Sequence, residues 1–525
     1  MKVLVSDQIS DLGVAKLRES VAVDVKTDLT PEELEQVIGE YDALVVRSST
    51  KVTRKVLENA GRLKVVGRAG VGVDNIDVEA ATERGVIVIN APEGNTISAA
   101  EHAIAMMTSL ARNIPNASAS MKAGEWKRSK FMGVELYNKT LGVVGMGRIG
   151  SEVIKRAQAM GMDILAYDPY ISAERAEKMG VTLTSTEEIY RKADFITMHT
   201  PLTKATKHMV SHDELAIMKD GVRIINCARG GLIDEEALYE ALKSGKVAGA
   251  ALDVFEEEPV TCNPLCELSN VIVTPHLGAS TEEAQVNVAV QVAEQVVNAL
   301  QGEPLVSAVN VSVIPPETLA DVKPFIPLMK KLGSFYTQVF NGQVESVEIL
   351  YSGEIANYPT TPLTNSFLIG LLSVILQETV NYVNAPVIAK QRGIKVREVA
   401  SKTVENFTNL ITVTIKTAEG TRTIAGTLFN KDDIRIVKID KYNIEVVPSR
   451  YMLVTKYMDM PGVIGRFGIT LGESNINIAG MQVGRQSIGG EAVMALQVDC
   501  PVPEDVIKKL EKLDAIVSIR FVKLD

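Results

Sequence analysis

The sequence predicts an α/β fold for residues 1–310, built on parallel sheets, and two smaller α+β domains after it. Three observations support this prediction. Short β-branched runs alternate with helical patterns as far as about residue 310, which is typical of parallel sheets with crossover helices. Residues 306–316 are rich in valine, serine and proline, as linkers often are. Residues 451–525 read as strand, helix, strand, strand, helix and strand.

Length and composition fit a multidomain globular protein. The chain has 525 residues, of which 46% are hydrophobic and 23% are charged. That length exceeds what one hydrophobic core supports, so we expect three or four domains. The hydrophobic and charged fractions are ordinary for a soluble protein.

Charge and hydropathy exclude several classes of partner. The net charge of −10 argues against a nucleic-acid or acidic-membrane partner, since both require clustered lysine and arginine. The chain opens on a strand-like run without a secretory pattern, and its longest apolar stretch, Phe367 to Leu376, is roughly half of a membrane span. We therefore expect a cytoplasmic protein without a membrane partner. The four cysteines lack metal-ligand spacing, so we expect no metal.

Residues 1–310 divide into two Rossmann-like units. The helical patterns Ser98–Arg112 and Thr281–Leu300 are the expected places where the chain crosses between the units, the second crossing returning to the first unit. The expected strands are Val3–Ser6, Ala43–Val46, Val65–Gly67, Val86–Ile89, Leu141–Gly145, Ile164–Tyr167 and Phe195–Met198.

The C-terminal part forms two further units. Residues 311–450 mix a helical pattern, Phe367–Val383, with β-rich runs at Ile411–Lys416 and Asn443–Val447, and hold no recognisable catalytic group of residues. Residues 451–525 follow the ferredoxin-like order βαββαβ. The expected strands are Tyr451–Tyr457, Asn477–Gly484, Ala492–Asp499 and Ile516–Val522, with one helix after Pro461-Gly462 and another at Glu504–Leu513.

A dinucleotide motif stands between the expected strand Leu141–Gly145 and a helix that should begin near Ser151. Gly145-Met146-Gly147-Arg148-Ile149-Gly150 matches GxGxxG, and Asp168 ends the next strand, 18 residues beyond Gly150. The glycines allow a tight turn and close approach to a pyrophosphate, which the helix N-terminus attracts. Asp168 would bind ribose hydroxyls and repel a 2′-phosphate, so the motif favours NAD over NADP.

Three residues in separate loop-like breaks suggest redox chemistry on a hydroxy acid. Arg229 follows the strand-like run Val222–Ile225, Glu258 ends an acidic run, and His276 follows Thr274-Pro275. An arginine can clamp a carboxylate through two parallel hydrogen bonds, and a histidine held by a carboxylate suits proton transfer near neutral pH. Taken singly, Arg229 could cap a helix, Glu258 could be a solvated charge and His276 could be a turn residue.

Three segments follow the dinucleotide motif along the chain: Asn226–Asp234, Asp253–Pro259 and Thr274–Ala279. The motif and these segments occur in the order found in the D-2-hydroxyacid dehydrogenases, and on this basis residues 1–310 resemble that family. The whole chain is similar to the long-form members of that family that oxidise 3-phosphoglycerate for serine synthesis. The resemblance implies a substrate-binding domain (1–97 plus 282–310), an NAD-binding domain (98–281), an intervening regulatory domain (311–450) and an ACT domain (451–525).

The same resemblance implies roles for single residues. His276 would be the acid/base, Glu258 would fix its tautomer and stabilise its cationic form, and Arg229 would anchor the substrate carboxylate. The other histidines (His102, His199, His208 and His212) are expected to lack this combination of turn context and partners. The expected cofactor contacts are Gly145, Gly147, Arg148, Ile149, Gly150, Asp168, Thr200, Cys227, Ala228, Arg229, Asp253, His276, Gly278 and Ala279.

Substrate contacts are expected at two strand ends of the first domain. Arg47 and Ser48 form one group; Arg68, Ala69, Gly70 and Val71 form the other. Backbone amides of the second group could cradle a carboxylate while the two arginines hold the distal phosphate. Arg128 lies in a basic segment that in the family can reach a neighbouring subunit's active site, although a solvated basic turn is the alternative.

The terminal domain resembles the amino-acid-binding edge of ACT domains at Tyr457, Asp459 and Asn477, which implies L-serine as effector, held across the interface of a homo-oligomer (a dimer or tetramer). Some relatives carry His and Asn where this chain has Tyr457 and Asp459, and a purely oligomerising ACT domain is the alternative. Two rival functions remain open. One is a glyoxylate or hydroxypyruvate reductase, and the other is a dinucleotide-sensing binding protein.

Overall fold

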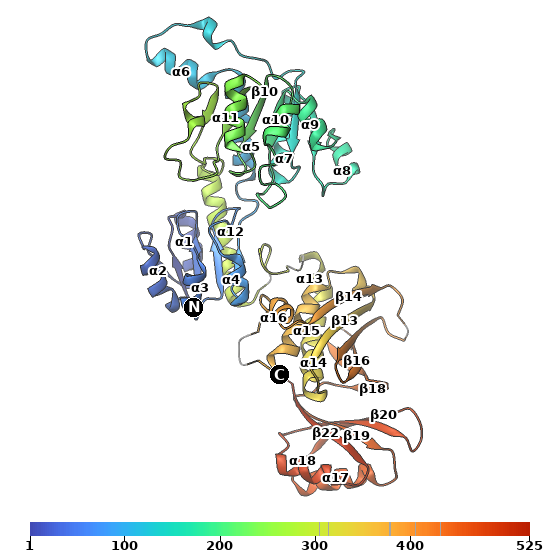
Figure 1. Cartoon of the computed structure of the whole chain (residues 1–525). Coiled ribbons are helices and arrows are strands. Elements are labelled where there is room, and N and C mark those ends of the chain that lie inside the picture. Colours follow the sequence, from blue (N-terminus) through green and yellow to red (C-terminus); the bar gives the residue numbers. More distant parts are fainter. Residues whose placement is uncertain are drawn as a thin grey trace.

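The computed structural model describes residues 1–524 except residues 304, 313, 315, 377–379, 405 and 431. Its strands form four sheets, and Figure 1 shows them as four units that follow one another along the chain. Two units are parallel α/β structures, and the two C-terminal units combine helices with predominantly antiparallel sheets. The predicted fold class is confirmed.

The first unit is a five-stranded parallel sheet in the order β2-β1-β3-β4-β5. Its strands are β1 (Lys2–Val5), β2 (Ala22–Val25), β3 (Ala43–Val46), β4 (Val65–Arg68) and β5 (Ile87–Ile89). Its helices are α1 (Asp11–Arg18), α2 (Pro31–Val37), α3 (Arg54–Asn59) and α4 (Val78–Glu83).

Helix α12 (Glu282–Gln301) returns from the second unit and packs on the sheet of the first. Its Val288, Val292 and Val296 are buried in one core with residues of β1, β3 and β4. Gly67 of β4 makes this close approach possible, because a Cβ there would lie 2.6 Å from Val296 and 2.7 Å from Val292. The absence of a side chain at Gly67 thus allows α12 to pack on the first sheet and complete the first unit.

The second unit is a seven-stranded parallel sheet in the order β12-β11-β10-β9-β6-β7-β8. Helix α5 (Thr96–Ala111) enters the unit and packs against α7 (Arg148–Ala159) and β11. The strands are β6 (Thr140–Val144), β7 (Asp163–Tyr167), β8 (Thr182–Leu183), β9 (Phe195–Met198), β10 (Val222–Asn226), β11 (Val247–Leu252) and β12 (Val271–Val273). The other helices are α6 (Ile114–Lys122), α8 (Ala173–Lys178), α9 (Thr186–Lys192), α10 (His212–Ile217) and α11 (Glu235–Ser244).

The third unit places helices on one face of a six-stranded sheet, β14-β13-β15-β16-β17-β18, in which only the β13–β14 pair is parallel. The strands are β13 (Val344–Gly353), β14 (Lys395–Ser401), β15 (Asn409–Thr417), β16 (Gly420–Phe429), β17 (Asp433–Ile439) and β18 (Tyr442–Val446). The helices are α13 (Pro316–Val322), α14 (Phe325–Val339), α15 (Thr361–Ser373) and α16 (Ala385–Gln391).

The fourth unit has the predicted βαββαβ order and an antiparallel sheet, β20-β21-β19-β22. Its strands are β19 (Tyr451–Met458), β20 (Ile478–Arg485), β21 (Glu491–Val498) and β22 (Ile516–Lys523), and its helices are α17 (Val463–Glu473) and α18 (Glu504–Glu511). One face of the sheet packs on these helices. The other face contributes Met452, Val454 and Val522 to the core of the third unit, so the two C-terminal units share a hydrophobic core.

Two predicted helix bounds are wrong. Helix α7 begins at Arg148 rather than near Ser151, because Gly147 is already its N-cap. The helical pattern Phe367–Val383 is not one helix, since α15 ends at Ser373 and α16 begins at Ala385. Part of that pattern, residues 377–379, lies outside the described residues. Among the residues that are described, no helix has both the length and the apolar character needed to cross a membrane.

The contact between Gly67 and α12 predicts a stability effect. A Gly67→Ala change should lower the free energy of unfolding by about 1–3 kcal/mol, because the added methyl group overpacks the valines of α12. Calorimetric unfolding would measure the shift of the transition. Gly61→Ala is the matched control, since a Cβ there meets nothing within 4 Å. Equal shifts in the two variants would contradict this packing argument.

Candidate active site

His276 and Glu258 form a hydrogen-bonded pair at the carboxyl end of the second sheet. The imidazole Nδ1 lies 2.7 Å from Glu258 Oε2, and both side chains are partly exposed. The His276 backbone adopts a positive φ of 54° and donates its N–H to the carbonyl oxygen of Asp253 at 2.9 Å. The turn after β12 therefore sets the position of the ring, and the carboxylate sets its orientation.

The ionisation of Glu258 defines the tautomer of this pair. Burial alone would raise the pKa of Glu258, but hydrogen bonds from His276 and from the N–H of Phe255 outweigh it and hold the pKa below its usual range. An ionised carboxylate can only accept a hydrogen bond. Nδ1 of His276 must therefore carry a proton, which leaves Nε2 as the nitrogen that can exchange a proton with a substrate.

Asp253 supports the loop that carries His276. Its side chain is fully buried and accepts four hydrogen bonds, so it anchors the loop instead of facing a ligand. Burial alone would raise its pKa, yet these bonds, with the one from His102 foremost, lower it. The donors are His102 Nε2 at 3.1 Å, Thr274 Oγ1 at 2.6 Å and the N–H groups of Leu277 at 2.7 Å and Gly278 at 2.9 Å.

Two of the other histidines also have close carboxylate partners, although His102 lies within helix α5 and only His208 combines a partner with a turn-like backbone. His102 pairs with buried Asp253, and His208 Nε2 lies 3.0 Å from Glu256 Oε1. His199 differs from both, because burial lowers its pKa to about 4 and its Nε2 lies 2.9 Å from the hydroxyl of Thr197. Sequence could not reveal the carboxylate partners of His102 and His208, since Asp253 and Glu256 follow β11, far along the chain from both histidines.

Arg229 connects the two α/β units. Its loop follows β10 and is held by Asn226, whose amide donates to the carbonyl oxygen of Arg229 at 2.9 Å. The guanidinium Nε lies 3.3 Å from Asp74 Oδ2, across in the first unit. A Cβ on Gly230 would collide with the carbonyl oxygen of Phe255, so this loop also packs directly on the loop that carries Glu258.

Arg68 and Arg47 lie close to Arg229. Burial, reinforced by the positive charges of Arg229 and Arg47, lowers the pKa of Arg68 to about 10. Asn75 holds this group together, because its side-chain oxygen accepts from Arg68 Nε at 3.2 Å and its amide donates to the carbonyl oxygen of Arg47 at 2.9 Å. Buried Asp7 accepts the N–H of Arg47 at 2.6 Å. The result is a cationic site at the junction of the two units.

The sequence analysis missed Asp7, Asp74 and Asn75, which support this cationic site. Asp7 follows β1 closely, so its place at the end of a strand was a usable signal. Asp74 and Asn75 gave none, because Arg229 and Arg47, which they contact, lie at the ends of other strands.

Backbone amides beside the arginines are free to bind an anion. Among the described residues, the N–H groups of Val71 and Gly72 donate to no acceptor. Ala69 and Gly70 are already engaged, the first with the carbonyl oxygen of Val46 and the second with that of Arg68, both at 2.8 Å. Ser48 is exposed. The predicted amide cradle is thus available at Val71 and Gly72 but not at Ala69 and Gly70.

The glycine-rich turn leaves room for a dinucleotide. Gly145 has a φ of 98°, and a Cβ there would lie 2.5 Å from the carbonyl oxygen of His199 and 3.0 Å from Cγ2 of Thr200. A Cβ on Gly147 would meet nothing within 4 Å, so the turn is open there. Asp168 accepts the N–H of Met146 at 2.8 Å, which ties the carboxylate to the turn. These residues fit a pyrophosphate at the start of α7 and a ribose at Asp168.

The other residues expected to contact the cofactor differ in their partners and in their burial. Arg148 forms an ion pair with Glu93 of the first unit at 3.2 Å. Ile149 is half-buried, and Ala228 donates its N–H to Asn226 Oδ1 at 3.1 Å. Burial raises the pKa of Cys227 far above its usual range, so this thiol stays protonated. The carbonyl oxygens of Gly278 and Ala279 accept bonds from Ser98 and Gln285, both at 2.8 Å.

Arg128 does not join the cleft. It begins an exposed short helical turn, Arg128–Phe131, after α6. Figure 1 shows α6 at the end of the second unit that lies away from the first unit. Among the described residues, no group of three His, Cys, Asp or Glu side chains could hold a metal ion.

The three residues expected to bind serine are not brought together within one chain. Tyr457 is buried, with no hydrogen-bond partner for its hydroxyl. Asp459 follows β19 and accepts from Arg485 at 2.9 Å, whereas Asn477 precedes β20 and donates to Asp499 at 2.7 Å. Because β19 and β20 both run antiparallel to β21, Asp459 and Asn477 lie at opposite ends of the sheet.

Family models match three parts of the chain. The NAD-binding domain of the D-isomer-specific 2-hydroxyacid dehydrogenases matches residues 104–278, the intervening domain of D-3-phosphoglycerate dehydrogenase matches residues 321–440, and the ACT domain matches residues 451–515. NAD is therefore the cofactor that the second unit binds.

Solved structures resemble the two α/β units. A D-lactate dehydrogenase from Aquifex aeolicus, complexed with NAD and lactic acid, is 29% identical with a TM-score of 0.52 and covers 58% of this chain and 96% of its own. A glyoxylate reductase from Paecilomyes thermophila is 32% identical with a TM-score of 0.55 and covers 61% of this chain and 99% of its own.

Curated relatives match over the full length. D-3-phosphoglycerate dehydrogenase from Methanocaldococcus jannaschii is 51% identical over 525 residues, covering 100% of both chains. Its counterpart from Bacillus subtilis is 47% identical over 523 residues, covering 100% of this chain and 99% of the relative. Full-length identity of this degree, together with all three domain matches, places the chain in the D-3-phosphoglycerate dehydrogenase family.

Proposed function

We propose that this chain oxidises 3-phosphoglycerate to 3-phosphohydroxypyruvate, the first committed step of serine synthesis. The observation that carries the proposal is the junction where Arg47, Arg68 and Arg229 converge beside free backbone amides. Such a site suits a substrate with two anionic groups, because arginine binds both carboxylate and phosphate through charge-assisted hydrogen bonds. The His276–Glu258 pair supplies the acid/base beside it.

The residues of the cleft divide the reaction between them. NAD, when bound, accepts the hydride that leaves the α-carbon of the hydroxy acid. Nε2 of neutral His276 takes the hydroxyl proton, because Nδ1 is occupied by Glu258. The carboxylate of Glu258 then stabilises the imidazolium. Arg229 holds the substrate carboxylate and stabilises negative charge on the oxygen that loses its proton.

Asp74 is the contact that substrate would replace. Its carboxylate lies 3.3 Å from Arg229 and is largely exposed, so little energy is needed to release it. A substrate carboxylate on Arg229, with the phosphate on Arg47 and Arg68, would then bridge the two units. Substrate binding and closure of the cleft are thereby linked, which excludes water from the site.

Serine inhibition would require two copies of the chain. Strand β20 is at the edge of its sheet, with Asn477 just before it and Arg485, the partner of Asp459, at its end. Antiparallel pairing of two β20 edges would bring Asp459 of one copy next to Asn477 of the other. A homo-oligomer joined in this way supplies a carboxylate and an amide to a bound amino acid.

The activity itself is tested by NADH formation with 3-phosphoglycerate, compared with glycerate, lactate and malate. The phosphorylated acid should have the highest kcat/KM. Reduction of glyoxylate and hydroxypyruvate by NADH is the comparison for the rival activity. A phosphorylated acid that is no better than the others would refute the proposed substrate.

Replacement of the acid/base should separate binding from chemistry. His276→Asn should lower kcat by about 10²- to 10⁴-fold, because the proton then has no acceptor. Steady-state kinetics would measure turnover. NADH fluorescence titration would measure cofactor binding, which should stay unchanged. His212→Asn is the control, since this exposed histidine lies outside the cleft. Wild-type turnover in His276→Asn would remove the residue from this role.

Loss of Arg47 should affect a phosphorylated substrate more than an unphosphorylated one. Arg47→Ala should lower kcat/KM for 3-phosphoglycerate by about 10- to 100-fold, the effect of one lost charge-assisted hydrogen bond. The loss for unphosphorylated glycerate should be much smaller. The exposed neighbour Lys51 provides the control, Lys51→Ala. Equal losses for the two substrates would argue against a phosphate contact.

Asp459 tests the regulatory proposal. Asp459→Ala should weaken serine inhibition of NADH formation, because the bound ammonium group loses its carboxylate. Basal activity should not change, since the residue lies in the ACT domain. Asp514→Ala, at an exposed carboxylate of the same domain, is the control. Unchanged inhibition, or a wild-type enzyme that serine does not inhibit, would exclude Asp459 as a serine contact.

A further inference from the structure

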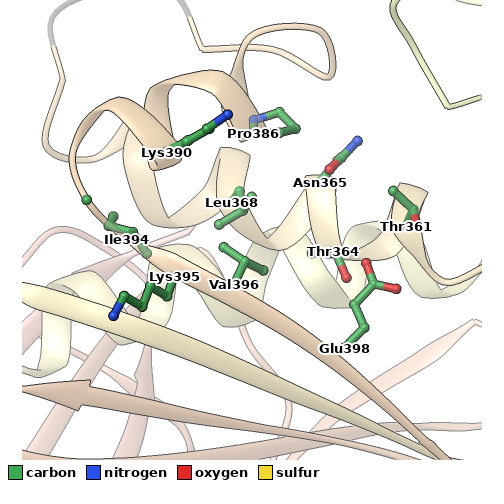
Figure 2. A pocket seen from close by; sticks show the side chains of 11 residues that line it. Thr361, Thr364, Asn365, Leu368, Pro386, Lys390, Ile394, Lys395, Val396 and Glu398 are labelled. Carbon is green, nitrogen blue, oxygen red and sulfur yellow. The ribbon is translucent and has the colours of Figure 1, made fainter. Parts of the chain in front are cut away.

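A cavity of about 760 Å³ lies in the third unit, between α15, α16 and the edge strand β14. Figure 2 shows Asn365 and Leu368 on α15, Pro386 and Lys390 on α16, and Val396 and Glu398 on β14 around it. A volume of this size is within the range of small-molecule sites. The cavity is far in sequence from the catalytic cleft and belongs to neither the NAD nor the substrate site.

Asn365 is the polar group that this cavity leaves without a partner. The residue is 6% exposed, and its side chain makes no hydrogen bond within the described part of the chain. The residues on either side of it are satisfied, since Thr364 pairs with the hydroxyl of Tyr351 at 2.8 Å and Ser366 donates to the carbonyl oxygen of Pro362 at 2.8 Å. Its amide lines the cavity and is therefore available to hydrogen-bond a water molecule or a ligand there.

The lining also carries an unpaired positive charge. Lys390 has no carboxylate partner among the residues that the structure describes, and Figure 2 shows its ammonium group beside Pro386 at the cavity. Glu398 is already engaged, because its Oε2 accepts the hydroxyl of Thr360 at 2.6 Å. Leu368 and the 37% exposed Val396 form an apolar wall between these polar groups. The lining therefore suits a molecule with an anionic end, an apolar body and a hydrogen-bonding group.

We propose that this cavity binds a small organic carboxylate with an apolar body. The carboxylate pairs with Lys390, the body covers Leu368 and Val396, and the amide of Asn365 binds a polar group of the ligand. This chemistry differs from that of the substrate, which is fully polar and carries two anionic groups. It also differs from that of serine, whose side chain has no apolar body.

The cavity wall is continuous with the contact between the third unit and the first. Asn381, four residues before α16, donates its amide to the carbonyl oxygen of Gly85 at 2.9 Å. Gly85 ends the turn before β5, and a Cβ there would lie 2.5 Å from the same amide. A ligand that shifts α16 thus acts on the substrate-binding unit, so occupancy of the cavity is coupled to affinity for the substrate.

A titration with 3-phenylpropionate tests the site. The full-length enzyme is saturated with NADH and 3-phosphoglycerate, which fill the cleft without turnover, and heat of binding is measured. We expect one site per chain with a dissociation constant of about 1 mM. The neutral analogue 3-phenylpropanamide should bind much more weakly, because it cannot pair with Lys390.

Variants locate the binding. Lys390→Glu should weaken binding of the probe at least about tenfold, because the new carboxylate would repel the carboxylate of the probe. Val396→Trp, at a partly exposed position, should fill the cavity and abolish binding. Lys402→Glu is the matched control, an exposed charge reversal just beyond β14. Absence of binding to the wild type, as when a second copy covers β14, would overturn the site. Wild-type affinity in Lys390→Glu and Val396→Trp would overturn it as well.

The coupling has a separate readout. The probe should change KM for 3-phosphoglycerate in the wild type, but not in Val396→Trp, which lacks the cavity. Asn381→Ala should bind the probe normally while KM no longer responds. A wild-type KM that the bound probe leaves unchanged would overturn the coupling. The coupling rests on the proposed function, since it is read from KM for 3-phosphoglycerate. The binding does not, because Lys390→Glu and Val396→Trp locate the probe whatever fills the cleft, and a wrong substrate assignment would show in the activity assays.

Discussion

Burial of Arg68 beside Arg47 and Arg229 is the constraint on which the catalytic part of the molecule depends. The lowered pKa of Arg68 reflects first its desolvation and then the repulsion between like charges gathered in a partly buried junction. Asp7 and Asn75 fix the two arginines of the first unit, and Asp74 partly neutralises Arg229. In the proposed function, an anionic substrate bound here would offset the repulsion and bridge the two units.

The catalytic pair depends on a second buried charge. Asp253 has no exposed surface and remains ionised through its four hydrogen bonds, two of which come from the backbone just after His276. A neutral side chain there would leave these N–H groups without acceptors. The imidazole of His276 is therefore positioned by a residue that does not touch substrate, and its direction is set by Glu258.

The two C-terminal units are packed together through a common core. Gln338 of α14 also exchanges two hydrogen bonds, both of 2.9 Å, with the backbone of Lys523 on β22. The ACT sheet and the intervening domain are therefore directly packed against each other, which is the contact through which the proposed effector site would reach the intervening domain. The intervening domain reaches the catalytic part through Asn381 and through the linker, where Asn310 accepts the N–H of Val88 at 2.8 Å.

The sequence by itself determined the alternation of strands and helices in residues 1–310, the βαββαβ order of the last unit, the dinucleotide turn and the identity of Arg229, Glu258 and His276 as candidates. These are local patterns, because periodicity, glycines and strand-end positions are written in consecutive residues. Only the tertiary structure decided that Ala69 and Gly70 are engaged while Val71 and Gly72 are free, that Asp253 is support, and that Asp459 and Asn477 lie apart. Those outcomes depend on hydrogen bonds and burial between segments far apart in the chain, and spacing along a sequence carries no record of which partner a group will find.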